Sequence, residues 1–221
     1  MDKQLVVFGL GDIGQLAHFY FTREGRYKVA GFTADAEYLN SDEFCGLPTV
    51  PFEELETRFP SSQFDLFVAL SYSEVNQLRA RKVAEAKEKG YELASYVSDQ
   101  ATVLSEEPIG ENCFILEDNT IQPFAKIGNN VTLWSGNHIG HHSVIEDHVF
   151  ISSHVVISGG VTIGARSFLG VNATFRDHIK IGKGNVIGAG ALILGDTEDD
   201  QLHTAEAAKL ARIPASRLRS I

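Results

Sequence analysis

An apolar residue occupies every sixth position of this chain from Val103 to Ile193, without one insertion. At a hydrophobic content of 43%, chance would produce such a run on the order of once in a million sequences. A helix cannot explain the pattern, because six residues step round its 3.6-residue turn and never line up one face. The sixteen positions are Val103, Ile109, Ile115, Ile121, Ile127, Leu133, Ile139, Ile145, Ile151, Ile157, Ile163, Leu169, Phe175, Ile181, Ile187 and Ile193.

A period of six predicts a solenoid of hexapeptide units, each a short strand and a corner, with three units closing one triangular coil. The residue two positions before each apolar one is usually small, as at Ala125 and Ala173, which suits the cramped inside of a corner. Glycine follows many of the apolar positions, as at Gly140 and Gly164. We therefore expect a left-handed parallel β-helix over residues 99–197 and a helical tail over 198–221.

The first 98 residues alternate short apolar runs with helical stretches, which predicts a small Rossmann-like parallel α/β sheet. We expect strands over 4–9, 27–32, 64–70 and 91–96, and helices over 15–22 and 74–89.

A G-x-G-x-x-G turn follows the first predicted strand, and its glycines let backbone amides approach phosphates at a helix N-terminus. Its candidate ligand contacts are Gly9, Gly11, Asp12, Ile13 and Gly14. Three interpretations stay open: a tight turn without a ligand, an NAD dehydrogenase, and a site for the nucleotide half of a sugar nucleotide. The last is favoured over the dehydrogenase because the front half has only about four strands and no separate catalytic domain follows.

Polar residues also follow the second and third predicted strands. Asp35 stands where such folds often place an acid on a ribose hydroxyl. Ser71, Tyr72 and Asn76 stand at the carboxyl edge of the sheet, where ligands bind, although polar residues at a strand end also serve as helix caps. We expect these residues to contribute to the same substrate site.

Composition excludes several classes of protein. The net charge is −10 and the Lys and Arg residues are scattered, which argues against a nucleic-acid or anionic-membrane surface. The opening apolar run is too short for a signal peptide, and no run reaches the about 18 apolar residues of a membrane span. Cys45 and Cys113 give no disulfide framework, and Cys113 falls at a small inward position of the solenoid. We expect a cytoplasmic protein without membrane insertion.

A histidine cluster lies in the solenoid, in the segment Trp134-Ser135-Gly136-Asn137-His138-Ile139-Gly140-His141-His142-Ser143. Because Ile139 points inward, His141 and His142 fall on the next corner and point outward. His141 stacks over Gly159 one coil further on, which leaves open space beside it. A corner histidine in this setting is well placed as a general base.

Other roles for these side chains stay open. His138, His141 and His142 invite a metal site, but on a strand and corner they diverge, so zinc would need ligands from another subunit. His148 and His178 are expected to be solvent-facing turn residues or interface hydrogen-bond donors. Trp134 faces outward and could stack on a sugar or base, or fill a subunit interface.

A front α/β domain joined to a hexapeptide solenoid carrying SGNHIGHHSVI resembles the bacterial sugar O-acyl/N-acyltransferases. These are the sialic acid O-acetyltransferase-like enzymes, which include N-acetyltransferases of UDP-4-amino sugars and of GDP-perosamine. The resemblance implies a homotrimer with acyl-CoA between subunits and His141 as general base, with His142 and His138 as further catalytic candidates. It implies acyl-CoA contacts at Ser158, Gly159, Gly188, Ala189 and Gly190, and sugar contacts at Trp134 and Asn137.

The chain also departs from this family's pattern. His142 stands where an acid often orients the catalytic histidine, Trp134 replaces a substrate-binding asparagine, and Ile13 replaces a histidine in the glycine turn. An orienting acid could instead come from Glu117, Asp118 or Glu146, in the same or an adjacent subunit.

The resemblance implies an acyltransferase that uses acetyl-CoA or another acyl-CoA and needs no metal. It would acylate an amine or hydroxyl of a nucleotide-linked or related sugar in surface glycan biosynthesis. Two other classes stay open. One is a trimeric metal-dependent lyase resembling the γ-class carbonic anhydrases, in which His142 and His178 would stack two coils apart. The other is a non-catalytic module that binds nucleotide sugars.

Overall fold

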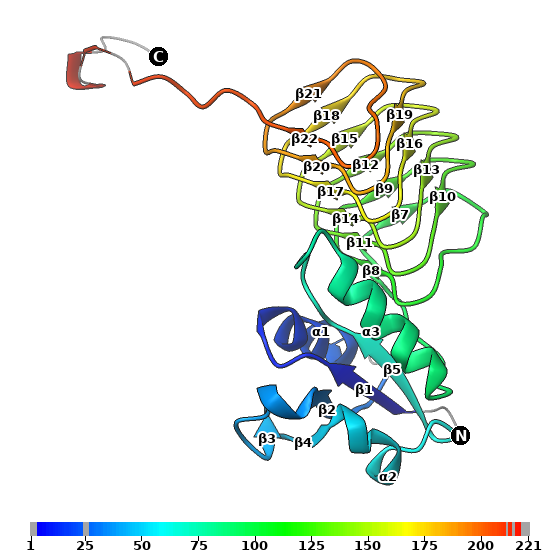
Figure 1. The fold of residues 1–221 in the computed structure, drawn as a ribbon. Helices are drawn as coiled ribbons and strands as arrows, with labels where there is room; N and C mark the ends of the chain where they lie inside the picture. The colour runs from blue at the N-terminus through cyan, green and yellow to red at the C-terminus, as the bar shows by residue number, and fades with distance from the viewer. Residues whose placement is uncertain (1–3, 24–26, 211, 214, 218–221) are drawn as a thin grey trace.

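The structure, a computed structural model, describes residues 4–23, 27–210, 212–213 and 215–217. A small α/β domain packs against one end of a long solenoid, and the C-terminal segment leaves the other end (Figure 1). Within the described part of the chain, no helix is long and apolar enough to cross a membrane.

Five strands form the sheet of the front domain in the order β3-β4-β2-β1-β5, all parallel except the β3–β4 hairpin. The strands are β1 (Gln4–Phe8), β2 (Val29–Ala34), β3 (Glu43–Phe44), β4 (Leu47–Pro51) and β5 (Phe64–Val68). The helices are α1 (Asp12–Arg23), α2 (Leu55–Arg58) and α3 (Gln77–Glu88), with short 3₁₀ turns η1 (Ala36–Tyr38) and η2 (Phe52–Glu54). This arrangement confirms the predicted Rossmann-like parallel sheet.

Two parts of the front domain differ from the sequence prediction. The strand expected over 91–96 is wrong, because Leu93 makes only an isolated bridge with Leu66 and Tyr96 already belongs to the solenoid. The β3–β4 hairpin was not predicted, because β3 has only two residues. The hairpin turns at Cys45 and Gly46, both of which have a positive φ.

The solenoid consists of two-residue strands that stack in three parallel sheets. Strands pair with others eighteen residues away, as His138 does with Val156, except that β20 and β22 pair at a spacing of sixteen. The first sheet contains β6 (Tyr96–Val97), β8 (Phe114–Ile115), β11 (Thr132–Leu133), β14 (Phe150–Ile151), β17 (Phe168–Leu169), β20 (Val186–Ile187) and β22 (Leu202–His203). The second contains β7 (Thr102–Val103), β9 (Thr120–Ile121), β12 (His138–Ile139), β15 (Val156–Ile157), β18 (Thr174–Phe175) and β21 (Leu192–Ile193). The third contains β10 (Lys126–Ile127), β13 (Val144–Ile145), β16 (Thr162–Ile163) and β19 (Lys180–Ile181).

The six-residue frame forms the interior of this solenoid, as predicted. Its apolar residues from Ile115 to Ile193 are at most 8% exposed, and the small residues two positions earlier are buried beside them. Three units per coil and parallel pairing confirm the left-handed β-helix.

The coil corners form three edges along the solenoid. Edge 1, between the first and second sheets, contains residues 116–119, 134–137, 152–155, 170–173 and 188–191. Edge 2, between the second and third sheets, contains residues 122–125, 140–143, 158–161 and 176–179. Edge 3, between the third and first sheets, contains residues 128–131, 146–149, 164–167 and 182–185. Residues eighteen apart therefore stack above one another along an edge, and we call each such row a corner column.

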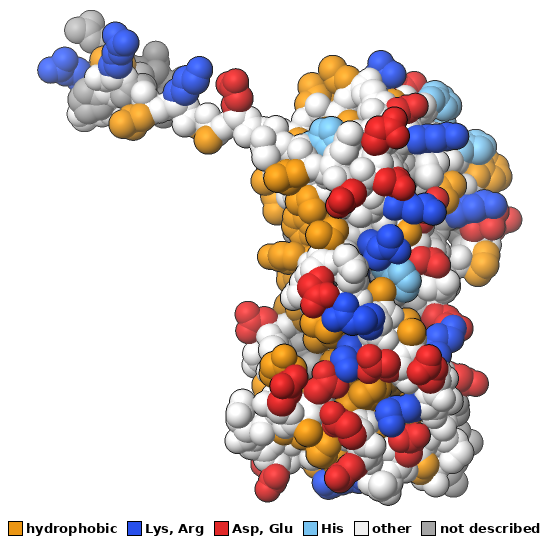
Figure 2. Space-filling model, in the orientation of Figure 1, with side chains coloured by type: hydrophobic (Ala, Val, Ile, Leu, Met, Phe, Trp, Pro, Cys, Tyr) orange, Lys and Arg blue, Asp and Glu red, His pale blue; other side chains and the backbone are white. Residues whose placement is uncertain are grey.

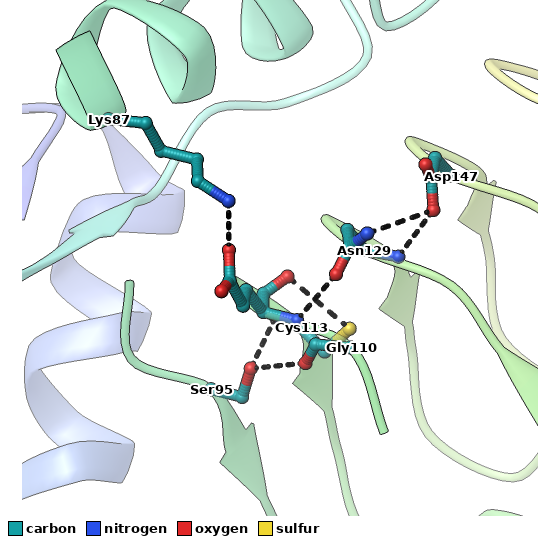
Figure 3. Close-up of polar contacts among 7 residues, drawn as sticks. Lys87, Ser95, Gly110, Cys113, Asn129 and Asp147 are labelled. Atoms are coloured by element: carbon teal, nitrogen blue, oxygen red, sulfur yellow. Dashed lines mark hydrogen bonds and ion pairs between the residues drawn. The ribbon is translucent and has the colours of Figure 1, made fainter. Parts of the chain in front are cut away.

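Polar contacts tie the first coils to the end of the front domain (Figure 3). The Ser95 hydroxyl donates to the Gly110 carbonyl at 2.8 Å and accepts the Cys113 amide at 2.9 Å, while Lys87 of α3 pairs with Glu111. Burial raises the pKa of the Cys113 thiol to about 11, so this cysteine stays protonated inside the core. It is a packing residue, as its place in the frame predicted.

The expected helical tail is wrong over its described residues. Leu202 pairs with Val186, so β22 extends the first sheet, and residues 204–210 have no regular secondary structure. A 3₁₀ turn, η3 (Ala215–Arg217), follows, and residues 211, 214 and 218–221 lie outside the described part. The alanine-rich stretch has helical propensity, but an isolated helix of this length is marginal without a surface to pack on.

Candidate functional site

The glycine turn between β1 and α1 contains two glycines that packing requires and one that it does not. Gly9 has a φ of +125°, and a Cβ there would lie 2.5 Å from the Ala69 carbonyl oxygen. A Cβ on Gly14 would collide with the Gly9 carbonyl, so packing within the turn already requires a glycine at position 14. At Gly11, by contrast, no described atom lies within 4 Å of the missing Cβ. The fold itself gives no reason for a glycine at position 11.

A cavity of about 660 Å³ lies between this turn and edge 1 of the solenoid. Its front-domain wall includes the predicted substrate residues Gly11, Asp12, Ile13, Ser71 and Tyr72. Its solenoid wall includes Trp134, Phe150, Ser152, Ser153 and Val171. We call it cavity 1.

A second cavity, of about 820 Å³, lies over the carboxyl ends of β1 and β2, and we call it cavity 2. Asp35 faces it and pairs with Lys82 of α3 at 2.7 Å. Burial lowers the pKa of Lys82, but its hydrogen bonds to Asp35 and Glu85 more than offset this, so the ammonium remains charged. Gly11 and Leu70 line both cavities, which therefore meet at the glycine turn.

Aromatic rings form the floor of cavity 1. The Tyr72 ring lies 5.2 Å from that of Phe150 and 4.6 Å from that of Phe168, and Trp134 lies 6.4 Å from Phe150. Phe150 is 2% exposed and is covered by Tyr72 and Arg79 of the front domain. Trp134 is half-buried and packs against the front-domain core while still facing the cavity.

Two buried polar residues, one in helix α3 and one at its N-cap, bind the front domain to the solenoid. Arg79 is 1% exposed and donates to the Thr132 hydroxyl at 2.7 Å and to the His148 carbonyl at 3.0 Å. Asn76 donates to the carbonyls of Arg166 and Ser167, so it binds the solenoid and not a ligand. Burial lowers the pKa of Arg79 to about 10, which leaves it charged at neutral pH. Sequence reasoning missed this contact, because an arginine on an amphipathic helix normally faces solvent.

His141 and His142 lie on edge 2, as frame arithmetic predicted. A Cβ on Gly159 would lie 2.6 Å from His141 Nε2, so the imidazole lies over this glycine. The His141 Nδ1 is 3.1 Å from the His142 Nδ1, and the His141 backbone amide donates to the Gln122 side chain at 2.9 Å. Both rings are exposed, which leaves His141 Nε2 accessible to an incoming group.

Asn137 and Glu117 do not reach His141 within one chain. Asn137 is 2% exposed, donates to the Trp134 carbonyl and accepts the Val155 amide at 2.7 Å, so it is a structural residue and not the predicted substrate contact. Glu117, on edge 1, accepts hydrogen bonds from Tyr20 and Ser135. Burial raises the pKa of Glu117, but hydrogen bonds from its own backbone amide, Ser135 and Tyr20 lower it below its ordinary value.

The other candidate acids also lie apart from His141. Asp118 lies on edge 1, and Glu146 lies on edge 3 and accepts the Ala165 amide at 2.9 Å. Within a single chain, the side chain that the structure places at the His141 ring is therefore His142.

The remaining histidines lie apart from this pair. His138 lies on β12 with its side chain half-buried on the outer face, and His154 lies on edge 1. His148, on edge 3, is hydrogen bonded to Asn130 at 2.9 Å, and burial lowers its pKa. The His178 ring lies over Gly160. Among the residues that the structure describes, no three His, Cys, Asp or Glu side chains converge as a metal site would require.

The predicted acyl-CoA residues fall into two groups on different edges. Ser158 and Gly159 lie on edge 2 beside His141, whereas Gly188, Ala189 and Gly190 lie on edge 1, in the same corner column as Val171 of cavity 1. One solenoid presents these groups at separate edges.

Four overlapping segments, residues 109–141, 124–159, 142–177 and 160–195, match the family described as bacterial transferase hexapeptide (six repeats). All four matched segments lie within the solenoid. No curated protein matched the sequence significantly.

Solved structures resemble the chain over both domains. One is a variant of perosamine N-acetyltransferase from Caulobacter crescentus in complex with CoA and GDP-perosamine, with TM-score 0.83, 23% identity, and 93% of this chain and 95% of that chain covered. Another is the acetyltransferase domain of PglB from Neisseria gonorrhoeae in complex with acetyl coenzyme A, with TM-score 0.82, 24% identity, and 95% and 99% covered. A third is WeeI from Acinetobacter baumannii, with TM-score 0.80, 18% identity, and 91% and 96% covered. The hexapeptide-repeat chain therefore shares its complete two-domain fold with these proteins.

Proposed function

We propose that this protein is an acyl-CoA-dependent, specifically acetyl-CoA-dependent, acyltransferase that modifies an amine or hydroxyl of a nucleotide-linked sugar in surface glycan biosynthesis. The observation that carries the proposal is the meeting of cavities 1 and 2 at Gly11, where the fold needs no glycine. Structures of the same fold bind CoA with GDP-perosamine, or acetyl coenzyme A, which supports this substrate pair.

In this proposal, a nucleotide sugar lies along both cavities, with its nucleoside, phosphates and sugar in three successive places. The nucleoside occupies cavity 2, with a ribose hydroxyl donating to Asp35. The phosphates lie at Gly11, where an added side chain would obstruct them and the N-terminus of α1 favours anions. The sugar then extends into cavity 1 and stacks on Trp134 and Tyr72.

His141 acts as the general base in this proposal. Its Nε2 removes a proton from the acceptor amine or hydroxyl, whose nitrogen or oxygen bonds to the acyl carbon of the thioester. The carbon–sulfur bond breaks, and the departing CoA thiolate takes the proton from His141. No acyl-enzyme forms, because Cys113 is buried and protonated and Cys45, at the β3–β4 turn, is remote from edge 2.

Each active site forms between two copies of a cytoplasmic homotrimer. Cavity 1 opens at edge 1 whereas His141 lies on edge 2, so the sugar of one copy meets the histidine of its neighbour. Apolar side chains gather along one side of the solenoid (Figure 2), which suits contact with another copy. The solenoid's exposed apolar residues include Val156, Val171, Leu192 and Leu202. A monomer at micromolar concentration in light scattering would refute this arrangement.

Gly11→Ala tests the nucleotide site without disturbing the fold, because the new methyl group meets no described atom within 4 Å. We expect the KM of the acceptor to rise roughly ten-fold, about 1.4 kcal/mol, while acetyl-CoA binding and the melting temperature stay unchanged. A panel of UDP-, GDP- and dTDP-amino sugars, screened by mass spectrometry with acetyl-CoA, identifies the acceptor. If neither acetyl-CoA nor any of the sugar nucleotides raises the melting temperature of the protein, the proposal is wrong.

His141→Ala and His141→Asn test the base. We expect kcat to fall by roughly 10²–10⁴-fold with KM and the trimer unchanged. A hydroxyl acceptor needs the base throughout, whereas a neutral amine can attack unaided and needs positioning above all. A defect at the top of the range therefore indicates O-acylation, and one near ten-fold indicates N-acylation. Full activity of His141→Ala would exclude this histidine as the base.

A further inference from the structure

The distance between the His141 and His142 rings indicates a hydrogen bond between them. Their Nδ1 atoms lie 3.1 Å apart with the rings nearly perpendicular, at an interplanar angle of 85°. Two imidazole nitrogens at this distance attract each other only if one carries hydrogen and the other offers its lone pair. The neutral pair can therefore adopt two arrangements, and they are chemically different.

Only one arrangement leaves a base at the accessible nitrogen of His141. If His141 Nδ1 carries the hydrogen, His142 Nδ1 accepts it and His141 Nε2 keeps its lone pair. If His142 Nδ1 carries the hydrogen, His141 must hold its own proton on Nε2 and cannot accept another. The direction of this one hydrogen bond decides whether the pair can take a proton from a substrate.

We propose that His142 is the positioning residue of the general base: its Nδ1 accepts the Nδ1–H of His141 and holds His141 in the tautomer with Nε2 free. This rests on the proposed role of His141. When Nε2 takes a proton from the acceptor, His141 becomes an imidazolium whose Nδ1–H still donates to neutral His142. The pair thus needs no carboxylate beside it.

The surrounding residues hold His142 in place for this role. Its ring packs on Phe124 of the preceding coil, with centroids 4.7 Å apart and planes 36° apart. Its φ of 58° fixes the corner backbone in the left-handed region. The bond from the His141 amide to Gln122 anchors the other partner at 2.9 Å.

Two substitutions at position 142 separate the acceptor from the ring. His142→Phe keeps an aromatic ring against Phe124 but removes the lone pair. His142→Asn loses the ring but places its amide oxygen as many bonds from Cα as the histidine Nδ1, and asparagine tolerates a left-handed backbone. We expect His142→Phe to lower kcat about 10- to 100-fold, in the range of lost orienting partners, with both KM values unchanged. His142→Asn should retain most of the activity.

His178→Phe is the matched control. His178 lies on the same corner column two coils further on, has a similar φ of 56° and packs over Gly160 rather than beside His141. The same substitution there makes the same change of side chain on a left-handed backbone, so it should leave kcat unchanged. A large loss in this control would mean that phenylalanine at an edge 2 corner damages the solenoid, and the defect of His142→Phe would then not support the proposal.

Nuclear magnetic resonance of isotope-labelled histidine rings reads the tautomer directly, without substrate. The wild type should have His141 protonated at Nδ1 and His142 at Nε2, and His142→Phe should shift His141 toward the Nε2–H form. Wild-type kcat in His142→Phe, the opposite tautomer assignment, or equal loss in His142→Phe and His142→Asn would each overturn the proposal. Full activity in His141→Ala would instead reject the base, leaving the ring resonances to report on the hydrogen bond alone.

Discussion

Gly159→Ala should lower the proposed acyltransferase activity by displacing the His141 ring. The added Cβ would lie 2.6 Å from His141 Nε2, whereas non-bonded heavy atoms pack at about 3.5 Å or more. The backbone of the coil cannot retreat because Gly160 N–H donates to the His141 carbonyl at 2.8 Å. The imidazole must therefore move by about 1 Å, and a misplacement of this size costs about 100-fold in rate, or about 2.7 kcal/mol in the activation barrier.

Steady-state kinetics with acetyl-CoA and the acceptor identified in the panel measure this loss, which should fall on kcat with the melting temperature unchanged. Gly195→Ala is the control, since it belongs to the same corner column and no described atom lies within 4 Å of its new methyl group. In a His141→Ala background the methyl has no ring to displace, so Gly159→Ala should cost nothing further. Losses that multiply in the double variant, or wild-type kcat in Gly159→Ala, would refute the reasoning.

Three further predictions concern the support of the site. Arg79→Ala leaves buried carbonyl and hydroxyl acceptors unpaired and should destabilise the protein by about 2–4 kcal/mol in chemical denaturation. Arg81→Ala removes an exposed ion pair on the same helix and should leave the stability almost unchanged. Lys82→Met frees Asp35 from its ion pair at 2.7 Å and should raise the KM of the acceptor but not that of acetyl-CoA; equal changes in both would contradict this. Because burial lowers the pKa of His148, the unfolded chain binds more protons than the native one below about pH 6.5. The melting temperature should therefore fall as the pH drops from 7 to 5, and fall less in His148→Asn; equal slopes would show that His148 does not contribute.

The solenoid and its histidine corner were predictable because their geometry is set by a short, exact repeat. Eighteen residues return the chain to the same edge, so counting alone placed His141 over Gly159. The same counting placed Cys113 inside. No long-range information was needed for any of these positions.

The front of the site was less predictable, because it depends on contacts between segments far apart in the sequence. The glycine turn was found, but only the packing of Gly14 on Gly9 distinguishes a structural glycine from the open one at position 11. The burial of Arg79 needs a solenoid surface more than fifty residues further on. The family resemblance implied a sugar contact at Asn137, yet its side chain turns inward and hydrogen bonds to Trp134 and Val155 of the solenoid.

The two-residue strands have a consequence for how this protein assembles. A strand as short as β12 finds its partners only in the coils before and after it, so a coil gains stability only on one that already exists. The front domain packs against the first coils and supplies such a starting surface through β6 and α3, whereas at the other end β22 is the terminal strand of the first sheet among the described residues. We therefore expect the coils to fold in order, starting next to the front domain, and local unfolding to begin at the end that contains β22. Truncations that remove whole coils from the C-terminal end should leave the lower coils folded, whereas loss of the front domain should leave the stack without its first template.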